Sequence, residues 1–235
     1  MIHGMMLVRN EASRDLETKH GIFTKVLESM KLLCDRLVVI DDKSTDGTVD
    51  YVSNYTSEVY TSPERLWDKN EVKQRELLWK LTLNEANHGD WIVCLDADEL
   101  IDNPRELKYM LNSLGSNVDG LGFRLFDMWS MTQYRADVLW NAHNCPWPMA
   151  IRYNASKDYV WHEKALHCGR FPANASQSML PTMIPIRHYG WALEEDRKKK
   201  YDRYMRIDGE GKHGILAQYE SILDENPNLV KFKGV

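Results

Sequence analysis

The chain has 235 residues, of which 43% are hydrophobic and 28% are charged, and its formal net charge is −5. This size and composition are typical of a folded domain with a substantial core. The negative charge argues against a general nucleic-acid binder, because such proteins neutralise phosphates with clustered positive charge. No apolar run approaches the roughly 18 residues of a membrane span, so we expect no transmembrane segment.

The N-terminus and the cysteines bear on the cellular compartment. The first residues lack the basic segment of a signal peptide and are interrupted by Arg9, Asn10 and Glu11. The cysteines at positions 34, 94, 145 and 168 are widely scattered, without the paired spacing of a metal site. This usage predicts reduced thiols, with those at 34 and 94 buried, and a cytoplasmic protein.

The first hundred residues alternate between apolar strands and amphipathic helices. Strands are expected at 5–8, 36–40, 58–60 and 91–95, and helices at 23–34, 48–55 and 70–87. A repeated strand–helix–strand order predicts a mainly parallel central sheet flanked by helices, an α/β fold.

Beyond Pro104 the pattern loosens. A helix is expected at 105–114, a strand at 120–126 and a strongly basic helix at 193–207, whereas 127–150 shows no clear period. No repeat or linker interrupts the chain. The simplest organisation is one domain over residues 1–235 with an elaborated C-terminal half.

The apolar strand at 91–95 ends abruptly in three carboxylates, Asp96, Asp98 and Glu99. In open α/β sheets ligands bind at the carboxyl ends of the strands. Acidic side chains one residue apart at such a bend can turn toward one hard cation. Mg²⁺ or Mn²⁺ is held in this way by one or two carboxylates together with substrate phosphates.

Two further polar clusters follow earlier strands, at residues 9–11 and at Asp41 and Asp42. Right-handed crossovers bring the carboxyl ends of parallel strands to a common edge. We therefore expect the three clusters to meet in one cleft.

The three clusters stand in the segments Val8-Arg-Asn-Glu11, Val39-Ile-Asp-Asp-Lys-Ser-Thr-Asp-Gly-Thr48 and Gly89-Asp-Trp-Ile-Val-Cys-Leu-Asp-Ala-Asp-Glu99. Their order and spacing resemble a family 2 glycosyltransferase of the GT-A fold. The resemblance covers residues 5–103 well and the region from about 155 to 205 only weakly. It implies a nucleotide-sugar-binding half at 1–103 and an acceptor-binding half at 104–235.

The resemblance also implies an activity, which is transfer of a sugar from a nucleotide-diphosphate sugar, such as a UDP-sugar, to a hydroxyl acceptor. The transfer would be metal-dependent and inverting. The acceptor would be a carbohydrate or a lipid-linked molecule, and the oligomeric state is not legible from the sequence.

Residue by residue, the resemblance assigns the donor site. Glu11 and the backbone at Val8 and Arg9 would contact the nucleoside, although many relatives have an aromatic residue where Arg9 stands. Asp41 or Asp42 would accept a hydrogen bond from the base. The remaining donor contacts would come from Arg75, facing the phosphates or base, and from Asp96 and Ala97.

The same resemblance makes Asp98 the ligand of a Mn²⁺ or Mg²⁺ ion that bridges the donor diphosphate. A metal suits this chemistry because the leaving nucleoside diphosphate develops negative charge as the glycosidic bond breaks. His188 resembles the late histidine that GT-A enzymes use as an additional metal ligand. A hydrogen-bonded core histidine is an equal alternative.

A general base must deprotonate the acceptor hydroxyl in an inverting transfer. Glu163, in a His-Glu pair shared with some relatives, is the candidate, and a surface glutamate is the alternative. Rival bases are Glu194, Glu195 and Asp196, which also suit the start of a helix, where the helix dipole favours acidic residues.

The C-terminal half offers two weaker features. The basic residues from 197 to 206 predict a solvated helix face, with docking of an anionic donor or of a lipid-linked acceptor at a membrane surface as the alternative. Four tryptophans could form a carbohydrate platform, although aromatic residues more often fill a core; these are Trp129, Trp140, Trp147 and Trp161.

Two other functions compete. The segment Leu95-Asp-Ala-Asp-Glu-Leu100 superficially fits the nucleophile motif of haloacid-dehalogenase-type phosphatases, in which one Asp attacks phosphorus. That motif normally opens the catalytic domain, whereas two strand–helix units precede it here. A non-catalytic nucleotide-binding module is the other alternative, because the aromatic residue is missing at Arg9.

Overall fold

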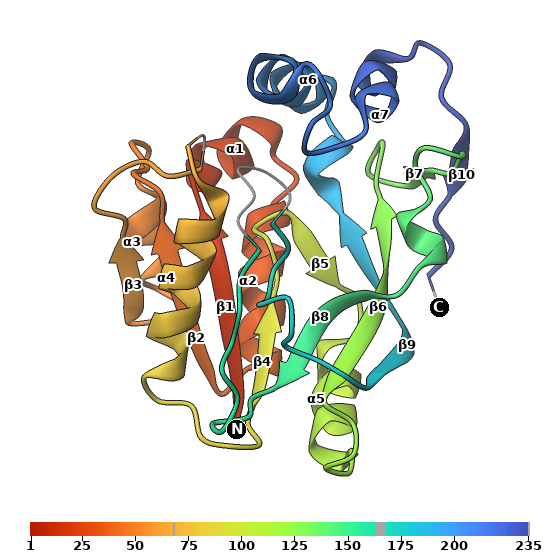
Figure 1. The fold of residues 1–235 in the computed structure, drawn as a ribbon. Helices are drawn as coiled ribbons and strands as arrows, with labels where there is room; N and C mark the ends of the chain where they lie inside the picture. Colours follow the sequence, from red (N-terminus) through yellow and green to blue (C-terminus); the bar gives the residue numbers. More distant parts are fainter. Residues whose placement is uncertain (68, 163–167, 235) are drawn as a thin grey trace.

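The computed structural model describes residues 1–67, 69–162 and 168–234. One eight-stranded sheet runs through the molecule in the order β3-β2-β1-β4-β8-β6-β9-β5, with helices packed around it (Figure 1). Four of the seven strand pairings are parallel, namely β3–β2, β2–β1, β1–β4 and β6–β9. The predicted α/β class with a mostly parallel central sheet is confirmed.

The N-terminal half contributes the four parallel strands at one side of the sheet. These are β1 (Ile2–Val8), β2 (Arg36–Asp41), β3 (Glu58–Thr61) and β4 (Trp91–Cys94). The connecting helices are α1 (Glu11–Thr18), α2 (Ile22–Leu33), α3 (Thr48–Val52) and α4 (Glu71–Leu83). Every predicted strand of this half is present, and the predicted helix at 70–87 ends early, at Leu83.

Alternation along β1 explains why helices cover both faces of this half. Met6 and Val8 pack in one core cluster with α2, whereas Met5 and Leu7 pack in another with α4. Successive side chains of a strand point to opposite faces, so a strand that is buried at every position, as β1 is, needs cover on both faces. Gly4 lets α2 approach closely, since a Cβ there would lie 2.8 Å from Met30.

Beyond these four strands the sheet continues with mixed directions. The C-terminal half adds β6 (Gly120–Asp127), β8 (Trp147–Arg152) and β9 (Met179–His188), and β5 (Glu99–Ile101) of the N-terminal half forms the edge beside β9. β8 runs antiparallel to both β4 and β6, and β5 antiparallel to β9. Beside these strands lie α5 (Pro104–Ser113), α6 (Glu194–Asp208), α7 (Leu216–Glu220) and the ribbon of β7 (Gln133–Arg135) with β10 (Leu229–Lys231).

Among the elements that the sequence analysis missed, three have identifiable reasons. The helix α1 is short and contains only two apolar residues, Ala12 and Leu16. β9 contains Pro181 and Pro185, which mask a strand pattern. β8 lies inside the stretch 127–150 where no period was visible.

Two of the four tryptophans that could form a carbohydrate platform are buried. Trp129 and Trp140 are 6% and 2% exposed and pack with Trp191, Tyr219 and Ile222 in a third core cluster. Their rings meet edge to face, with centroids 4.8 Å apart for Trp129 and Trp140. These two residues therefore fill a core, the alternative given above, whereas Trp147 is half exposed.

The cysteines are reduced thiols in this structure. All four cysteines are unpaired, and those at 34, 94 and 168 are buried, as predicted for 34 and 94.

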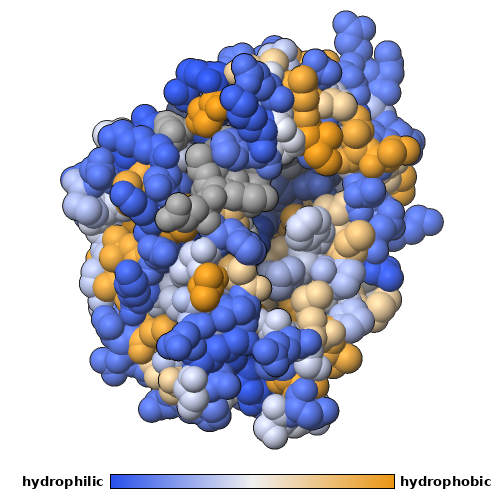
Figure 2. All heavy atoms as spheres, viewed as in Figure 1, coloured by the Kyte–Doolittle hydropathy of each residue, from blue (hydrophilic) through white to orange (hydrophobic). Residues whose placement is uncertain are grey.

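None of the helices in the described ranges combines the length and apolarity that a bilayer span requires. The face drawn in Figure 2 is mostly hydrophilic, with a larger hydrophobic group at upper right, near α7 and β10 of Figure 1.

Candidate active site

The carboxyl ends of β1, β2 and β4 meet at one edge of the sheet. Val8 pairs with Asp41 across β1 and β2, and Met5 pairs with Cys94 across β1 and β4. The residues that follow each strand therefore gather at this edge, which lies at the top of Figure 1 beside α1 and α6. The predicted meeting of the three clusters is confirmed.

The loops after β1 and β2 are bonded to each other. Thr45 donates its backbone N–H to the side chain of Asn10, which adopts a left-handed conformation with φ of 53°. The hydroxyl of Thr48 accepts the backbone N–H of Glu11 at 3.0 Å, and Asp46 caps the next turn through Ser13. These side chains satisfy the N–H groups that the first turn of α1 leaves unbonded. The segment 44–48 thus fixes the direction of α1.

Asp41 and Asp42 are 1% and 2% exposed. Asp41 accepts the backbone N–H of Ser44, and Asp42 accepts those of Leu66 at 2.9 Å and Trp67 at 3.2 Å. Both carboxylates therefore organise loops around the edge. A carboxylate has about four lone-pair positions, so these backbone hydrogen bonds do not use the full accepting capacity of either.

Arg9 and Ala97, beside these groups, make contacts within the fold. The guanidinium of Arg9 donates to the backbone oxygen of Asp42 at 3.0 Å, which ties the ends of β1 and β2 together. Ala97 is 4% exposed and packs in the main core cluster. Val8, at the end of β1, is likewise buried.

Asp96 is clamped between two arginines. Arg75 of α4 donates to one carboxylate oxygen, and Arg170 lies against the other, each at 2.9 Å. Arg170 also pairs with the buried Glu99. Burial opposes the charged form of Asp96, but Arg170 and Arg75 outweigh it and lower its pKa. Arg75 is only 3% exposed, so it lies beneath Asp96 rather than in solvent.

Asp98 faces a different set of groups. His188, at the end of β9, has its Nε2 atom 3.7 Å from a carboxylate oxygen of Asp98, and its Nδ1 atom 2.8 Å from Asp127, at the end of β6. Lys200 of α6 places its ammonium 3.7 Å from the other oxygen of Asp98. Burial raises the pKa of Asp98, but Lys200 and His188 outweigh it and the pKa is lowered.

Gly190 allows these groups to approach one another closely. A Cβ at this position would lie 2.5 Å from Asp98 and 2.6 Å from His188, and closer still to Lys200. Three polar groups therefore converge where a larger residue would stand.

Glu11, at the start of α1, completes the acidic side of the site. Its carboxylate lies 3.3 Å from Arg14, and that arginine reaches on to Asp196 of α6 at 2.8 Å. Burial raises the pKa of Glu11 to about 7, with Asp98 adding to the rise and Arg14 opposing it. The ion pair of Arg14 with Asp196 joins the two halves of the chain across the site.

The helix α6 lies across this edge, and its basic residues divide into two sets. Lys198 and Lys199 are exposed, as expected for a solvated face. Arg197 donates to the backbone oxygen of Trp191 at 2.6 Å, and Arg203 to that of Trp67 at 3.1 Å. The prediction of one solvated basic face is therefore wrong for the residues that turn toward the site.

The candidate bases are distributed differently. Glu163 lies outside the described residues. Glu194 is exposed and paired with Lys198, and Asp196 is engaged by Arg14. Together with Glu195 they form the acidic first turn of α6, which is the helix-start alternative.

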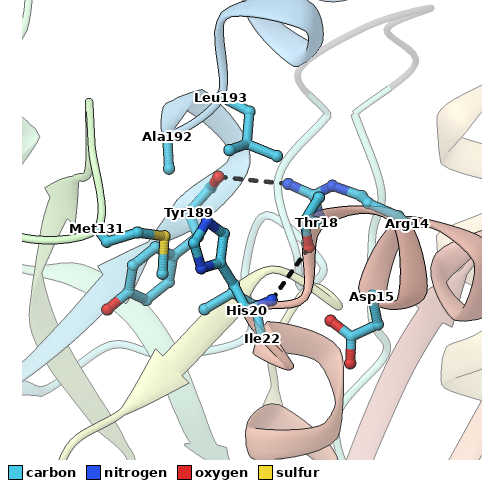
Figure 3. Close-up of a pocket in the computed structure, with 9 residues that line it drawn as sticks. All are labelled: Arg14, Asp15, Thr18, His20, Ile22, Met131, Tyr189, Ala192 and Leu193. Carbon is cyan, nitrogen blue, oxygen red and sulfur yellow. Dashed lines mark hydrogen bonds between the residues drawn. The ribbon is translucent and has the colours of Figure 1, made fainter.

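A small cavity borders the site through Arg14 and Tyr189 (Figure 3). Its other walls include Thr18, His20 and Met131, and its volume is about 10 Å³. Such a space holds roughly one water molecule, so it is not a donor pocket.

The comparisons with known proteins agree with this geometry. The sequence profile described as glycosyl transferase family 2 matches residues 20–126. The predicted resemblance to this family is confirmed. The matched stretch includes Asp41, Asp42, Arg75 and Asp98, but not Glu11 or His188.

Solved structures show the same fold. S. aureus TarS is 17% identical, with a TM-score of 0.51 over 95% of this chain and 42% of that one. S. aureus TarS 1-349 in complex with UDP is 16% identical, with a TM-score of 0.52 over 95% of this chain and 70% of that one. The predicted GT-A architecture is therefore confirmed.

Two mycobacterial proteins are similar in sequence. They are uncharacterized protein Mb3815c of Mycobacterium bovis and uncharacterized protein Rv3786c of Mycobacterium tuberculosis, each 24% identical over 214 residues and 84% of this chain. The chain spans half the length of these relatives.

Proposed function

We propose that this chain transfers a sugar from a UDP-sugar to a hydroxyl acceptor, with inversion and with the help of Mn²⁺ or Mg²⁺. The observation that carries the proposal is the gathering of Glu11, Asp41, Asp42 and Asp98 at one sheet edge, with His188 turned toward Asp98. The family match and a fold shared with a UDP-bound structure support it.

In this proposal the nucleoside binds along the ends of β1 and β2. Glu11 and the backbone at Val8 and Arg9 contact it, and Asp41 or Asp42 accepts a hydrogen bond from the base. The dense bonding of the two loops supports this role, because a preformed site loses little entropy when the ligand binds. Asp96, held by Arg75 and Arg170, is positioned to accept from ribose or sugar hydroxyls.

The residues at the end of β4 fit a divalent metal. Asp98 and His188 would hold it, since the Nε2 atom of His188 faces a carboxylate oxygen of Asp98. Asp127 would fix the orientation of His188, as carboxylates do for metal-bound histidines. The described residues contain no group of three His, Cys, Asp or Glu side chains that could hold a metal ion. Two protein ligands suit Mg²⁺ or Mn²⁺, whose other ligands are donor phosphates and water.

When bound, the metal would supply positive charge to the departing diphosphate. The chain's own part is to orient the donor against Asp96 and to exclude alternative poses. We further propose Glu163 as the base that takes the proton of the acceptor hydroxyl, opposite the leaving group. The acceptor is proposed to be a carbohydrate or a lipid-linked molecule.

The test is titration calorimetry of UDP with the wild-type chain, with Mn²⁺ and with a chelator. We expect Mn²⁺ to strengthen UDP binding, and Asp98→Asn to abolish this gain. The matched control is Asp202→Asn, the same change at an exposed position of α6. UDP binding that ignores the metal, or no binding of any nucleotide sugar, would contradict the proposal.

A donor-hydrolysis assay separates an enzyme from a non-catalytic module. Glycosyltransferases without acceptor can transfer the sugar slowly to water, so we expect slow metal-dependent release of UDP from a panel of UDP-sugars. Binding without any release would favour the module.

A further inference from the structure

Lys200 is the basic residue of α6 that reaches Asp98. Its ammonium lies 3.7 Å from the Asp98 carboxylate and 4.4 Å from the centre of the Trp191 ring. Its side chain is 27% exposed, whereas that of Lys198, two residues earlier, is 61% exposed. The ammonium therefore sits in the candidate site and not on the solvated face of the helix.

The position of this ammonium is set by contacts on both sides of α6. Asp196 binds Arg14 of α1 in the first turn of the helix, and Arg203, about one turn after Lys200, binds the backbone of Trp67. Gly190 removes the side chain that would otherwise stand between Lys200 and Asp98. Contacts before and after Lys200 hold this part of α6 in place, and the glycine lets the ammonium approach Asp98.

The charge at Asp98 explains why a cation is useful there. An ionised carboxylate at a buried site is costly unless a positive group compensates it. Asp96 has two arginines for this purpose, whereas Asp98 has Lys200 and His188. A divalent metal bound by Asp98 and His188 would repel the ammonium. Lysine has a flexible four-carbon stem, so its ammonium can swing to the phosphate oxygens that the same metal binds.

We propose that Lys200 is a diphosphate-binding residue that neutralises Asp98 without the metal and contacts the donor diphosphate once the metal is bound. This inference rests on the proposed function. It gives Lys200 effects of opposite sign on two equilibria. The residue opposes binding of the metal alone and favours binding of the nucleotide with the metal.

The experiment compares Lys200→Gln with Lys199→Gln, which removes the same charge from an exposed position of the same helix. Binding of Mn²⁺ alone is followed by the EPR signal of free Mn²⁺. Binding of UDP in saturating Mn²⁺ is followed by calorimetry. Circular dichroism checks folding, and Lys200→Met, which retains an aliphatic stem beside Trp191, repeats the test with more of the packing preserved.

For Lys200→Gln we expect Mn²⁺ alone to bind about two- to fivefold more tightly, because a partly exposed ion pair no longer has to break. We expect UDP with Mn²⁺ to bind about tenfold more weakly, since a charge-assisted hydrogen bond is lost. Lys199→Gln should leave both constants near the wild-type values.

The outcomes separate the two proposals. A Lys200→Gln variant that weakens both equilibria together, or that behaves like Lys199→Gln while the wild type binds both ligands, overturns the role of Lys200 alone. A wild type that binds neither Mn²⁺ nor UDP overturns the proposed function and this inference with it.

Discussion

The two halves of the chain contribute different balances of charge to the groups around Asp96 and Asp98. The N-terminal half brings carboxylates, Glu11, Asp41 and Asp98, from loops that follow parallel strands. The C-terminal half brings Arg170 from a loop, His188 from the end of β9 and Lys200 from α6. Buried carboxylates are costly unless positive groups compensate them, and these three residues add to Arg14 and Arg75 of the N-terminal half.

Asp96 and Asp98 show the difference within two residues. Asp96 is held by two arginines in short contacts of 2.9 Å, a permanent arrangement. Asp98 faces a lysine and a histidine at 3.7 Å each, contacts that are too long for hydrogen bonds. The comparison indicates that Asp96 is held in one orientation, whereas Asp98 can exchange its present partners for a ligand more easily.

The largest effect on stability should come from removing Arg170, which pairs with both Asp96 and Glu99. Arg170→Met leaves Glu99, whose side chain is 1% exposed, without its arginine, and removes one of the two partners of Asp96. Stranding a buried charge is strongly destabilising, so we expect the free energy of unfolding in urea to fall by about 3 kcal/mol.

A second variant tests the cause. Arg170→Met combined with Glu99→Gln removes the stranded charge as well, so it should recover part of the lost stability, as coupled neighbours do. Equal stability of Arg170→Met and the wild type would show that the clamp on Asp96 does not stabilise the fold.

How much of this could be predicted from sequence differs between the halves. The strands at 36–40 and 91–95 are short apolar runs closed by acidic turns, and parallel topology alone brings their ends together. Asp98 and Asp42 could therefore be found by residue pattern. Arg14 could not, because α1, the helix that carries it, has too few apolar residues to be recognised as an amphipathic helix.

The C-terminal contributions were harder for physical reasons. Lys200 stands in a run of four basic residues, and only the position of α6 decides which of them faces inward. Arg170 follows no regular element, so nothing in the sequence marks it. Asp127 was within reach, because it comes directly after the predicted strand at 120–126 and lies at the end of β6.

The next largest effect concerns the groups around Asp98, and it tests whether Asp127 orients His188. Asp127 accepts from His188 at 2.8 Å, which leaves the other ring nitrogen toward Asp98. Asp127→Asn should lower the affinity for Mn²⁺ by about 10- to 100-fold, the usual effect of removing a partner that orients a metal-bound histidine. The measurement is the EPR titration of Mn²⁺.

Asp119→Asn is the control for this change. Asp119 accepts backbone N–H groups of Gln177 and Ser178, outside the candidate site. It should reduce stability without changing the Mn²⁺ affinity. If both variants bind Mn²⁺ like the wild type, His188 does not depend on Asp127 for a metal-binding role.

The smallest effect should come from Glu11, whose partner Arg14 also pairs with Asp196 of the C-terminal half. Burial raises the pKa of Glu11 to about 7 from an ordinary value of 4.5, and the nearby Asp98 adds to the rise. A raised acid pKa means that the folded chain binds more protons than the unfolded chain between these values. Stability from this group is therefore complete below pH 4.5 and is lost as the pH rises through 7.

Glu11→Gln cannot ionise, so it should escape this loss. In a chelator, we expect it to equal the wild type near pH 5 and to exceed it by about 2 kcal/mol at pH 8, measured by urea unfolding. Glu17→Gln, at an exposed position of α1, should follow the wild type at both pH values. A constant difference between Glu11→Gln and the wild type at pH 5 and pH 8 would mean that the pKa of Glu11 is not raised in the folded chain.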